Sequence, residues 1–591
     1  MAVDKVIVTN LTALKQKYQA AGVKAIQAAV QDLIAADKQR GLITTLVALD
    51  DKAGMKKLSA PVVTDAADPK QNKRAIDGVY KALVPDYLMI LGAPDVVPHQ
   101  DIKNPIFNAP GDDPNEQGDE DEFAPSDLPY ACDAPYSQNA HDFTGPTRVV
   151  GRLPDVTGAT GSPKYLLGLL KTATKWRSRP REEYQNYFGL SAEIWQKSTA
   201  ESLKKVFNSD TDIQTCPTKG YEWERKLCNR LIHFVNCHGG KAFPNFLGQA
   251  QDDRQNMPVS HLAVYVARAK NLAEGTVAAV ECCYGGQLYD PAEVELQGYP
   301  PELLAKKNQM GMCNVYLAKK AYGFFASTTI AYGPATHNDW ADLICQYFVQ
   351  RVLAGASLGR AALEARQRFV EQNAPMSPTD LKTLAQFNLF GDPSITPVAA
   401  PTSKLAVGAR IVHLTTGVPP TGAKGMANAK AVYQVASAER AERRQTLRAK
   451  GTMLASIQPT ITRTETAPSK QIADSFAQLA QQLNLRQLGT VSYNCEAPAP
   501  APTTAMSSAA KGIMKAAALK KPDTTAFHVF VGTPQASAAE MKSMKKGAGK
   551  KGAGKAGAKG AQAKKHPVRH LVVLEAKEVG GNIVISEGHS K

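Results

Sequence analysis

The sequence lacks any long hydrophobic run. No stretch approaches the roughly 18 consecutive apolar residues of a membrane-spanning helix, so no transmembrane segment is expected. The opening residues, MAVDKVIVTN, carry an early acid and no apolar core behind a basic start, so a secretion signal is not expected either. The 43% hydrophobic and 21% charged residues are typical of a soluble globular chain.

Cysteine is scarce, and its count is odd. The 591 residues include nine cysteines, which stand in apolar contexts such as LIHFVNC (231–237) and GMCNVYL (311–317). This pattern favours reduced thiols over a disulfide framework. We therefore expect a cytoplasmic protein, in which a catalytic thiol would stay usable.

Acidic residues are absent from one long stretch of the chain. Residues 541–566 hold nine lysines and no acid, whereas residues 111–122 (GDDPNEQGDEDE) are strongly acidic. Much of the net charge of +16 therefore lies in a low-complexity segment. Because this segment has no interleaved aromatic residues, it is more typical of a flexible linker than of a nucleic-acid site. The acidic stretch is most simply a surface loop.

Apolar strands alternate with helices over the first two thirds of the chain. The expected strands are 44–50, 86–92, 127–133, 147–154, 187–192, 231–237, 276–282 and 323–330. The expected helices are 11–39, 72–83, 165–176, 260–272, 311–321 and 338–371. Nearly continuous apolar strands between helices predict an α/β fold with parallel sheets covered on both faces. Ligands of such sheets bind at the carboxyl ends of the strands.

The composition changes after FNLFGDPSITPV (387–398) and becomes rich in Ala, Lys, Thr and Pro. We expect an N-terminal α/β subdomain over 1–185, a catalytic domain over 186–400 and a smaller β-containing domain over 401–591. Strands of this last domain are expected at 405–413, 526–532, 569–576 and 582–586. A disordered Lys/Gly/Ala-rich insertion is expected over 535–566.

Two of the expected strands end in residue types that nucleophilic catalysis needs. LIHFVNC is followed by His238-Gly239-Gly240, and TVAAVEC is followed by Cys283-Tyr284-Gly285-Gly286. Because side chains alternate along a strand, only one member of each pair, Cys237/His238 and Cys282/Cys283, faces a given side. A zinc site made from all four residues is disfavoured for the same reason.

An imidazole beside a thiol can accept its proton and later protonate the leaving amine. The amides of Gly239 and Cys283 are candidates to hold the developing oxyanion. Glu193 and Trp195 follow the strand 187–192 and are candidates to line the cleft. A surface acid and an ordinary packed Trp are equally good interpretations of these two residues.

The paired strand ends resemble the caspase-like cysteine peptidases, whose pattern is an apolar strand ending in His-Gly and a later one ending in x-Cys-x-Gly. The gingipain branch is most similar, through AVECCYGG (279–286), FFASTTIAYGP (324–334) and FNLFGDPSI. The resemblance implies a caspase-like parallel-sheet sandwich with Cys283 as nucleophile and His238 as its base. It places Tyr332 at the wall of a substrate pocket, although core packing explains this residue equally well.

The resemblance also implies a role for Glu281. This residue stands two places before Cys283, so alternation puts it on the same side of the strand. An acid at this place lines the pocket for the residue before the cut in several related families. We therefore expect an endopeptidase that cleaves after Lys or Arg and that can process itself.

Two other functions stay open from the sequence. The chain can be a catalytically silent caspase-like scaffold, or a basic protein that binds nucleic acid through residues 541–566. For the peptidase, the expected partner is a protein or peptide substrate. A regulatory protein partner is left open by the sequence. Nucleic acid is disfavoured as a partner, no membrane association is expected, and the reaction needs neither a cofactor nor a metal.

Overall fold

The computed structural model describes most of the chain. The described residues are 3–108, 118–217, 219–253, 256–268, 270–294, 299–399, 423–496, 524–535, 570–579 and 582–591. Within these residues no helix is both long and apolar enough to cross a bilayer.

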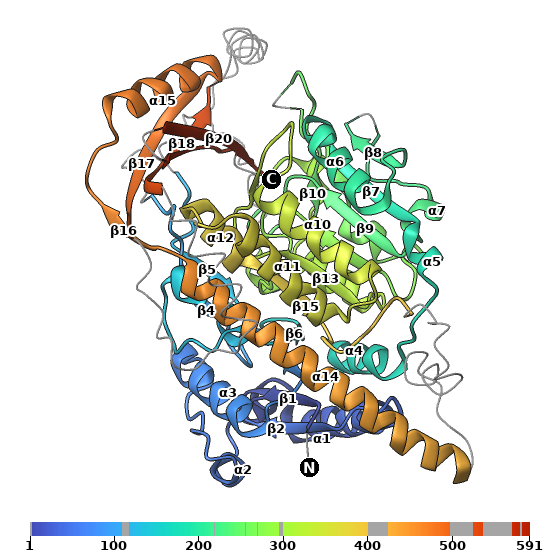
Figure 1. Cartoon of the computed structure of the whole chain (residues 1–591). Coiled ribbons are helices and arrows are strands. Elements are labelled where there is room, and N and C mark those ends of the chain that lie inside the picture. The colour runs from blue at the N-terminus through green and yellow to red at the C-terminus, as the bar shows by residue number, and fades with distance from the viewer. Residues whose placement is uncertain are drawn as a thin grey trace, which may run out of the picture.

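A ten-stranded sheet forms the centre of the molecule (Figure 1), in the order β2-β1-β3-β6-β15-β13-β12-β9-β7-β8. Its strands are β1 (Lys5–Thr9), β2 (Thr44–Ala48), β3 (Tyr87–Leu91), β6 (Val150–Leu153), β7 (Tyr187–Ala192), β8 (Ile213–Cys216), β9 (Ile232–Asn236), β12 (Val277–Val280), β13 (Gly323–Ser327) and β15 (Phe387–Gly391). The predicted α/β fold with a large, mostly parallel sheet is confirmed.

The strands of the two halves of this sheet run in opposite directions. β15 pairs in parallel with β6 and antiparallel with β13, and the other pairs described in this sheet are parallel. The carboxyl ends of β9, β12 and β13 therefore meet at one edge, where a ligand site is expected. The predicted domain boundaries near residues 185 and 400 stay predictions.

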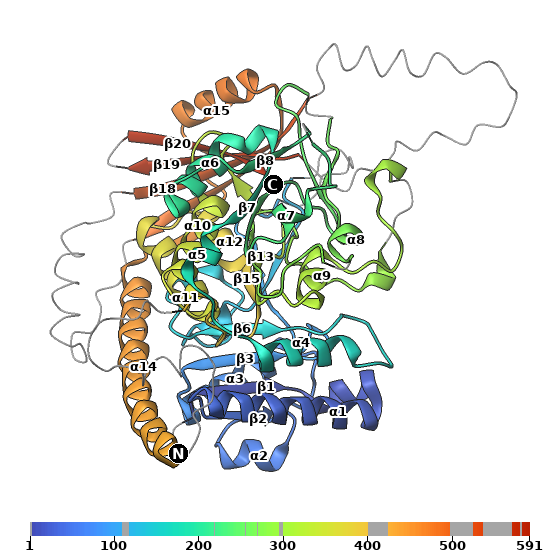
Figure 2. The same ribbon diagram turned by 90° about the vertical axis from the view of Figure 1, so that its right-hand side faces the viewer.

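Helices cover both faces of the sheet (Figure 2). One hydrophobic cluster joins the sheet to α1 (Leu11–Gln39), α4 (Lys164–Lys175) and α9 (Met312–Ala318). A second cluster joins the opposite face to α10 (Trp340–Leu353), α11 (Leu358–Gln372) and α12 (Pro378–Gln386). The remaining helices of this part are α2 (Lys52–Lys57), α3 (Pro69–Leu83), α5 (Arg181–Gln185), α6 (Gln196–Phe207), α7 (Arg225–Cys228) and α8 (Ala263–Val266).

Three of the expected elements differ in the structure. The strand expected over 127–133 is the short 3-10 helix η1 (Pro129–Ala131), because Pro129 has no N–H for a strand ladder. The helix expected over 260–272 begins as β11 (Val259–His261), which pairs with β10 (Phe246–Leu247). Tertiary pairing overrides local propensity at that place.

The long helix expected over 338–371 is divided into α10 and α11. Gly355 has a φ of 82° between them, a conformation that favours glycine. Ser357 then caps α11 by accepting a hydrogen bond from the amide of Arg360. The division lets α10 lie against β12 and brings Asp342 near the carboxyl end of that strand.

A second, antiparallel sheet lies in the C-terminal part, in the order β14-β20-β19-β18-β17-β16. Its strands are β14 (Tyr332–Gly333), β16 (Thr460–Thr464), β17 (Leu485–Glu496), β18 (Thr524–Pro534), β19 (Val572–Val579) and β20 (Asn582–Ser590), with α15 (Lys470–Gln482) packed against it. The β-containing C-terminal domain is confirmed. The strand expected over 405–413 and nearly all of the insertion expected over 535–566 lie outside the described residues.

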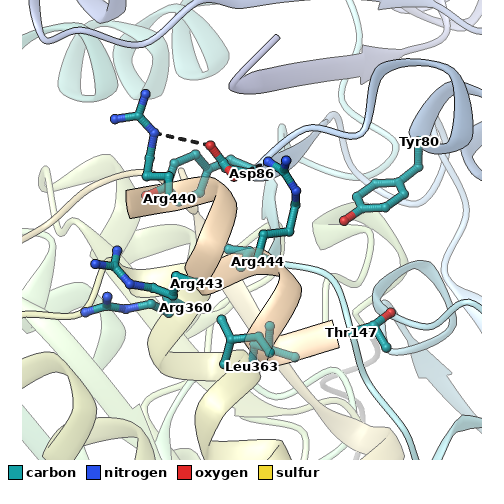
Figure 3. A pocket seen from close by; sticks show the side chains of 11 residues that line it. Tyr80, Asp86, Thr147, Arg360, Leu363, Arg440, Arg443 and Arg444 are labelled. Atoms are coloured by element: carbon teal, nitrogen blue, oxygen red, sulfur yellow. Dashed lines mark hydrogen bonds and ion pairs between the residues drawn. The ribbon is translucent and has the colours of Figure 1, made fainter. Parts of the chain in front are cut away.

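The long helix α14 (Ala423–Ile457) was not expected from the sequence. It packs against α11, and its arginines pair with acids that directly precede β1 and β3. Arg440 donates to Asp86 at 3.2 Å (Figure 3), and Arg444 also pairs with Asp86. Arg440 donates to Asp4 as well, at 2.9 Å. Burial favours the neutral form and raises the pKa of Asp86, so the two guanidinium groups are what offset the cost of its charge.

Candidate active site

The two predicted catalytic residues lie at adjacent strand ends. β9 and β12 are parallel neighbours in which Val235 pairs with Val280. Continuing this register by three residues places His238 opposite Cys283. Both residues are nearly or completely buried, with Cys283 at 4% exposure.

Alternation along β12 separates the two adjacent cysteines. Val277, Ala279 and Cys283 belong to the hydrophobic cluster on the α10 side of the sheet. Cys282 belongs to the opposite cluster, together with Cys237 from the end of β9. The structure thus presents Cys283, not Cys282, to the side on which α10 lies.

Gly239 lets the two strand ends come together. A Cβ atom added to this residue would lie 1.8 Å from the carbonyl oxygen of Cys283, so a side chain there would force the loops apart. This close approach explains why glycine follows His238.

His238 is held by the segment that follows it. Its Nε2 lies 2.6 Å from Oε1 of Gln249, and its ring packs at 4.4 Å from the ring of Trp195. With Gln249 as the acceptor, Nε2 carries the proton and Nδ1 carries the lone pair. A neutral imidazole in this tautomer can accept a thiol proton at Nδ1.

The thiol of Cys283 lies against the chain that follows β13. Its Sγ accepts from the amide of Ala331 at 3.3 Å and lies 3.5 Å from the carbonyl oxygen of that residue. Burial raises the pKa of the Cys283 thiol to about 12, so the thiol is protonated in this arrangement. A buried, protonated thiol is a poor nucleophile until its surroundings open.

A lysine side chain fills a pocket beside the thiol. The Nζ of Lys591 lies 2.7 Å from Oε2 of Glu281 and 2.5 Å from Oδ1 of Asp342, and 5.6 Å from the ring centre of Trp195. Gly333 closes the pocket, because a Cβ there would lie 2.2 Å from Cε of the lysine. We call Glu281, Asp342, Trp195 and Gly333 the lysine pocket.

The lysine pocket is completely buried, since the three larger side chains and Lys591 have no exposed surface. Burial is the main cause that raises the pKa of Glu281, and the neighbouring Asp342 carboxylate raises it further. The ammonium of Lys591 opposes both effects. Glu281 and Asp342 thus hold the ammonium of Lys591 between two carboxyl groups.

The main chain of Lys591 is also bound at the site. Its main-chain oxygen accepts from the amide of Cys283 at 2.5 Å, and its own amide donates to the carbonyl of Ala331 at 2.9 Å. The preceding residues pair with β14, with Ser590 opposite Tyr332. The amide of Cys283, a predicted oxyanion donor, thus binds the main-chain oxygen of the residue whose side chain fills the pocket.

The comparison with protein families decides what this site belongs to. A sequence model described as "Peptidase family C25" matches residues 3–398. The chain belongs to peptidase family C25. It is therefore a cysteine peptidase, and its predicted resemblance to the gingipain branch is confirmed.

No curated protein matches this C25 peptidase. Two solved structures are similar to it, each at 12% identity over 67% of this chain. One is titled "Structure of Protease", with a TM-score of 0.41 over 79% of its length. The other is an Arg-specific cysteine proteinase, gingipain R, with a TM-score of 0.42 over 78% of its length. Neither likeness assigns a substrate to this chain.

Tyr332 and Glu193 lie at the margins of the site. The Tyr332 side chain is buried and donates to Asp119 at 2.9 Å, so this residue reaches the cleft through its main chain. Glu193 is partly exposed and accepts from the amide of Gln251 at 3.3 Å, close to the segment that holds His238. Their substrate-binding roles stay predictions.

Part of the acidic stretch supports the site and does not form a surface loop as expected. Asp121 accepts from the amide of Ile330 at 2.9 Å and from the hydroxyl of Tyr284 at 2.8 Å, so it fixes the loops on both sides of Cys283. Asp119 pairs with Lys382 in the core beneath Tyr332. Residues 109–117 lie outside the described residues.

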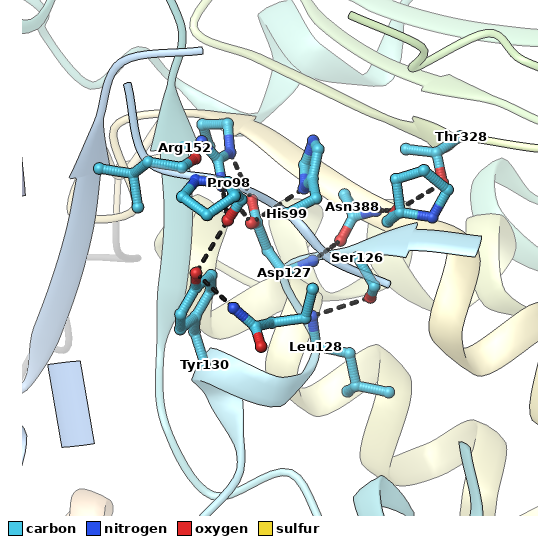
Figure 4. Close-up of polar contacts among 12 residues, drawn as sticks. Pro98, His99, Ser126, Asp127, Leu128, Tyr130, Arg152, Thr328 and Asn388 are labelled. Atoms are coloured by element: carbon cyan, nitrogen blue, oxygen red, sulfur yellow. Dashed lines mark hydrogen bonds and ion pairs between the residues drawn. The ribbon is translucent and has the colours of Figure 1, made fainter. Parts of the chain in front are cut away.

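A buried polar network anchors the loop that follows β13, which contains Thr328 and Ala331 (Figure 4). Arg152 donates to Asp127 at 2.9 Å, and His99 lies 3.0 Å from the same carboxylate. The amide of Asp127 donates to Asn388 in β15, and Thr328 donates to the adjacent Pro125 carbonyl at 2.7 Å. The loop that binds the thiol is thereby fixed to both halves of the sheet.

Sequence reasoning missed two members of the lysine pocket. Asp342 stands in the first turn of α10, and no motif connects it to the strand ends. Gly333 belongs to AYGP, but its contact with a substrate-like side chain appears only when β14 is paired. The only local signal was the position of Asp342 itself, an acid in the first turn of a helix.

Proposed function

We propose that this C25 peptidase is an endopeptidase that uses a Cys283–His238 dyad and cleaves after basic residues, with lysine preferred. The observation that carries the proposal is the lysine ammonium held between Glu281 and Asp342. A substrate residue in the same position has its carbonyl carbon beside Cys283. Arginine is the second choice, because its longer side chain must fit the same closed pocket.

The chemistry follows from the residues around the thiol. His238 takes the proton of Cys283, and the thiolate attacks the carbonyl carbon of the residue before the cut. The amide of Cys283, with that of Gly239 as its predicted partner, stabilises the oxyanion. The protonated imidazole then gives its proton to the leaving amine, and water hydrolyses the thioester.

The test is a set of fluorogenic peptides that differ only in the residue before the cut. The wild type and a Lys591→Ala variant are both assayed, so that a blocked pocket is not mistaken for an inactive enzyme. We expect cleavage after Lys, weaker cleavage after Arg and none after Asp. Cys283→Ala should abolish the activity, whereas Cys282→Ala should retain it because its side chain lies on the opposite face. Cleavage that survives Cys283→Ala would refute the assignment.

Self-processing is part of the proposal. Residues 541–566, which lie outside the described residues, are rich in Lys and Gly and poor in apolar groups. We expect the active enzyme to cut itself in this stretch. Intact-mass measurement of the wild type and Cys283→Ala after incubation checks this: equal nicking of the two would count against self-processing.

A further inference from the structure

The last residues of the chain occupy the active site as a bound substrate would. Ser590 pairs with Tyr332 of β14, and Lys591 donates to Ala331, so an extended segment adds a strand to the edge of the cleft. Strand addition of this kind is a common way for proteins to bind peptides, with alternate side chains entering pockets. Figures 1 and 2 both show the C-terminal end of the chain beside the catalytic half of the sheet.

We propose that residues 588–591 are an intramolecular inhibitor that blocks the active site and presents Lys591 in the position of the residue before the cut. This inference rests on the proposed function, because the pocket filled by Lys591 is the one assigned to substrate. Three groups that a substrate needs are already engaged: the Cys283 amide, the Glu281 carboxylate and the Ala331 carbonyl. Binding of substrate and of this segment is therefore mutually exclusive.

The segment is held in place by the rest of the C-terminal sheet. β20 pairs with β19 over eight residue pairs, from Val572–His589 to Val579–Asn582. The side chain and the amide of Ser590 both bond to Leu571, at 2.8 and 2.9 Å. Because the segment is tethered to the body of the protein, its effective concentration at the site is high, about millimolar for a flexible tether.

Gly588 lies where β20 packs tightly against α10. A Cβ added to Gly588 would lie 2.2 Å from the indole of Trp340, the first residue of α10. A side chain at this position fits only if β20 or the indole of Trp340 moves. Gly588→Val therefore should weaken the block, and it substitutes no residue of the lysine pocket or the dyad.

The reactivity of the Cys283 thiol measures the block without depending on which substrate the enzyme cleaves. Cys283 is 4% exposed beneath this segment, so its reaction with iodoacetamide reports whether the site is covered. The assay compares wild type, Lys591→Ala, Gly588→Val and the control Val584→Thr, which changes an exposed residue of the same strand. Peptide mapping quantifies the label at Cys283.

We expect Lys591→Ala and Gly588→Val each to increase Cys283 alkylation and cleavage after Lys by about tenfold or more, with Val584→Thr unchanged. The peptide SEGHSK, which repeats residues 586–591, should inhibit the opened variants competitively, and SEGHSA should not. Equal alkylation in wild type and in a folded Lys591→Ala chain would overturn the inference. Increased alkylation without peptide cleavage would instead support the inhibitory role of residues 588–591 and refute the proposed peptidase function.

Discussion

Asp342→Asn is the substitution that separates the charge of the lysine pocket from its shape. The variant keeps the size of the side chain and removes one of the two carboxylates that contact the ammonium, at 2.5 Å and 2.7 Å. A hydrogen bond to a charged group contributes about 1.5–3 kcal/mol, which is about a ten- to a hundred-fold change in kcat/KM. Because Glu281 remains as a partner, we expect the lower end, about tenfold for a substrate with Lys before the cut.

The pH dependence gives an independent readout of the same substitution. Glu281 must be ionised to bind a cation, and the Asp342 carboxylate raises its pKa. In the Lys591→Ala background, kcat/KM should therefore fall as the pH drops through the raised pKa of Glu281. Asp342→Asn removes one cause of the increase, so this acid limb should move to lower pH.

The assay measures kcat/KM across pH for two peptides with Lys or norleucine before the cut, with iodoacetamide labelling of Cys283 as the control. Asp342→Asn should lower kcat/KM for the Lys peptide only. The rate of Cys283 labelling at a given pH should be the same with and without this substitution. An equal loss for both peptides, or an acid limb that does not move, would refute the role of Asp342 in the pocket.

Two further predictions follow from other contacts. Gly333→Ala should lower kcat/KM for the Lys peptide and spare cleavage after a smaller residue. The added methyl group would lie 2.2 Å from Cε of a lysine placed as Lys591 is. Equal cleavage of the Lys peptide by this variant and by the parent enzyme would contradict the prediction. Burial lowers the pKa of His233 to about 4, and its Nδ1 lies 2.7 Å from the hydroxyl of Tyr316. Below about pH 6.5, His233 therefore takes up a proton in the unfolded chain but not in the folded chain. This histidine alone should lower the free energy of unfolding by about 2 kcal/mol between pH 7 and pH 5. Urea unfolding at the two pH values measures the loss, and His233→Gln should make it smaller.

The part of the candidate site that could be predicted from sequence depends on local patterns. Alternation along a strand assigns Cys283 and Glu281 to one side and Cys282 to the other, whatever the rest of the fold does. Glycine directly after His238 signals a close approach, which the contact of Gly239 with Cys283 explains.

The rest of the site depends on contacts between distant parts of the chain. Asp342 reaches the pocket only because α10 lies against β12, and Lys591 only because β20 extends the edge of β14. Composition predicted strands in the C-terminal part but not their partners. The acidic residues 119 and 121 looked solvated in sequence, yet buried partners such as Lys382 and Tyr284 draw them into the core.

The most direct test of the central claim is to identify the cysteine that a substrate-like reagent modifies. The Lys591→Ala chain is treated with an acyloxymethyl ketone that carries lysine before the reactive group, and peptide mapping locates the label. We expect a single adduct on Cys283, which should be lost when the free peptide SEGHSK competes. An adduct on Cys282, or no adduct on a folded chain whose Cys283 reacts with iodoacetamide, would contradict it.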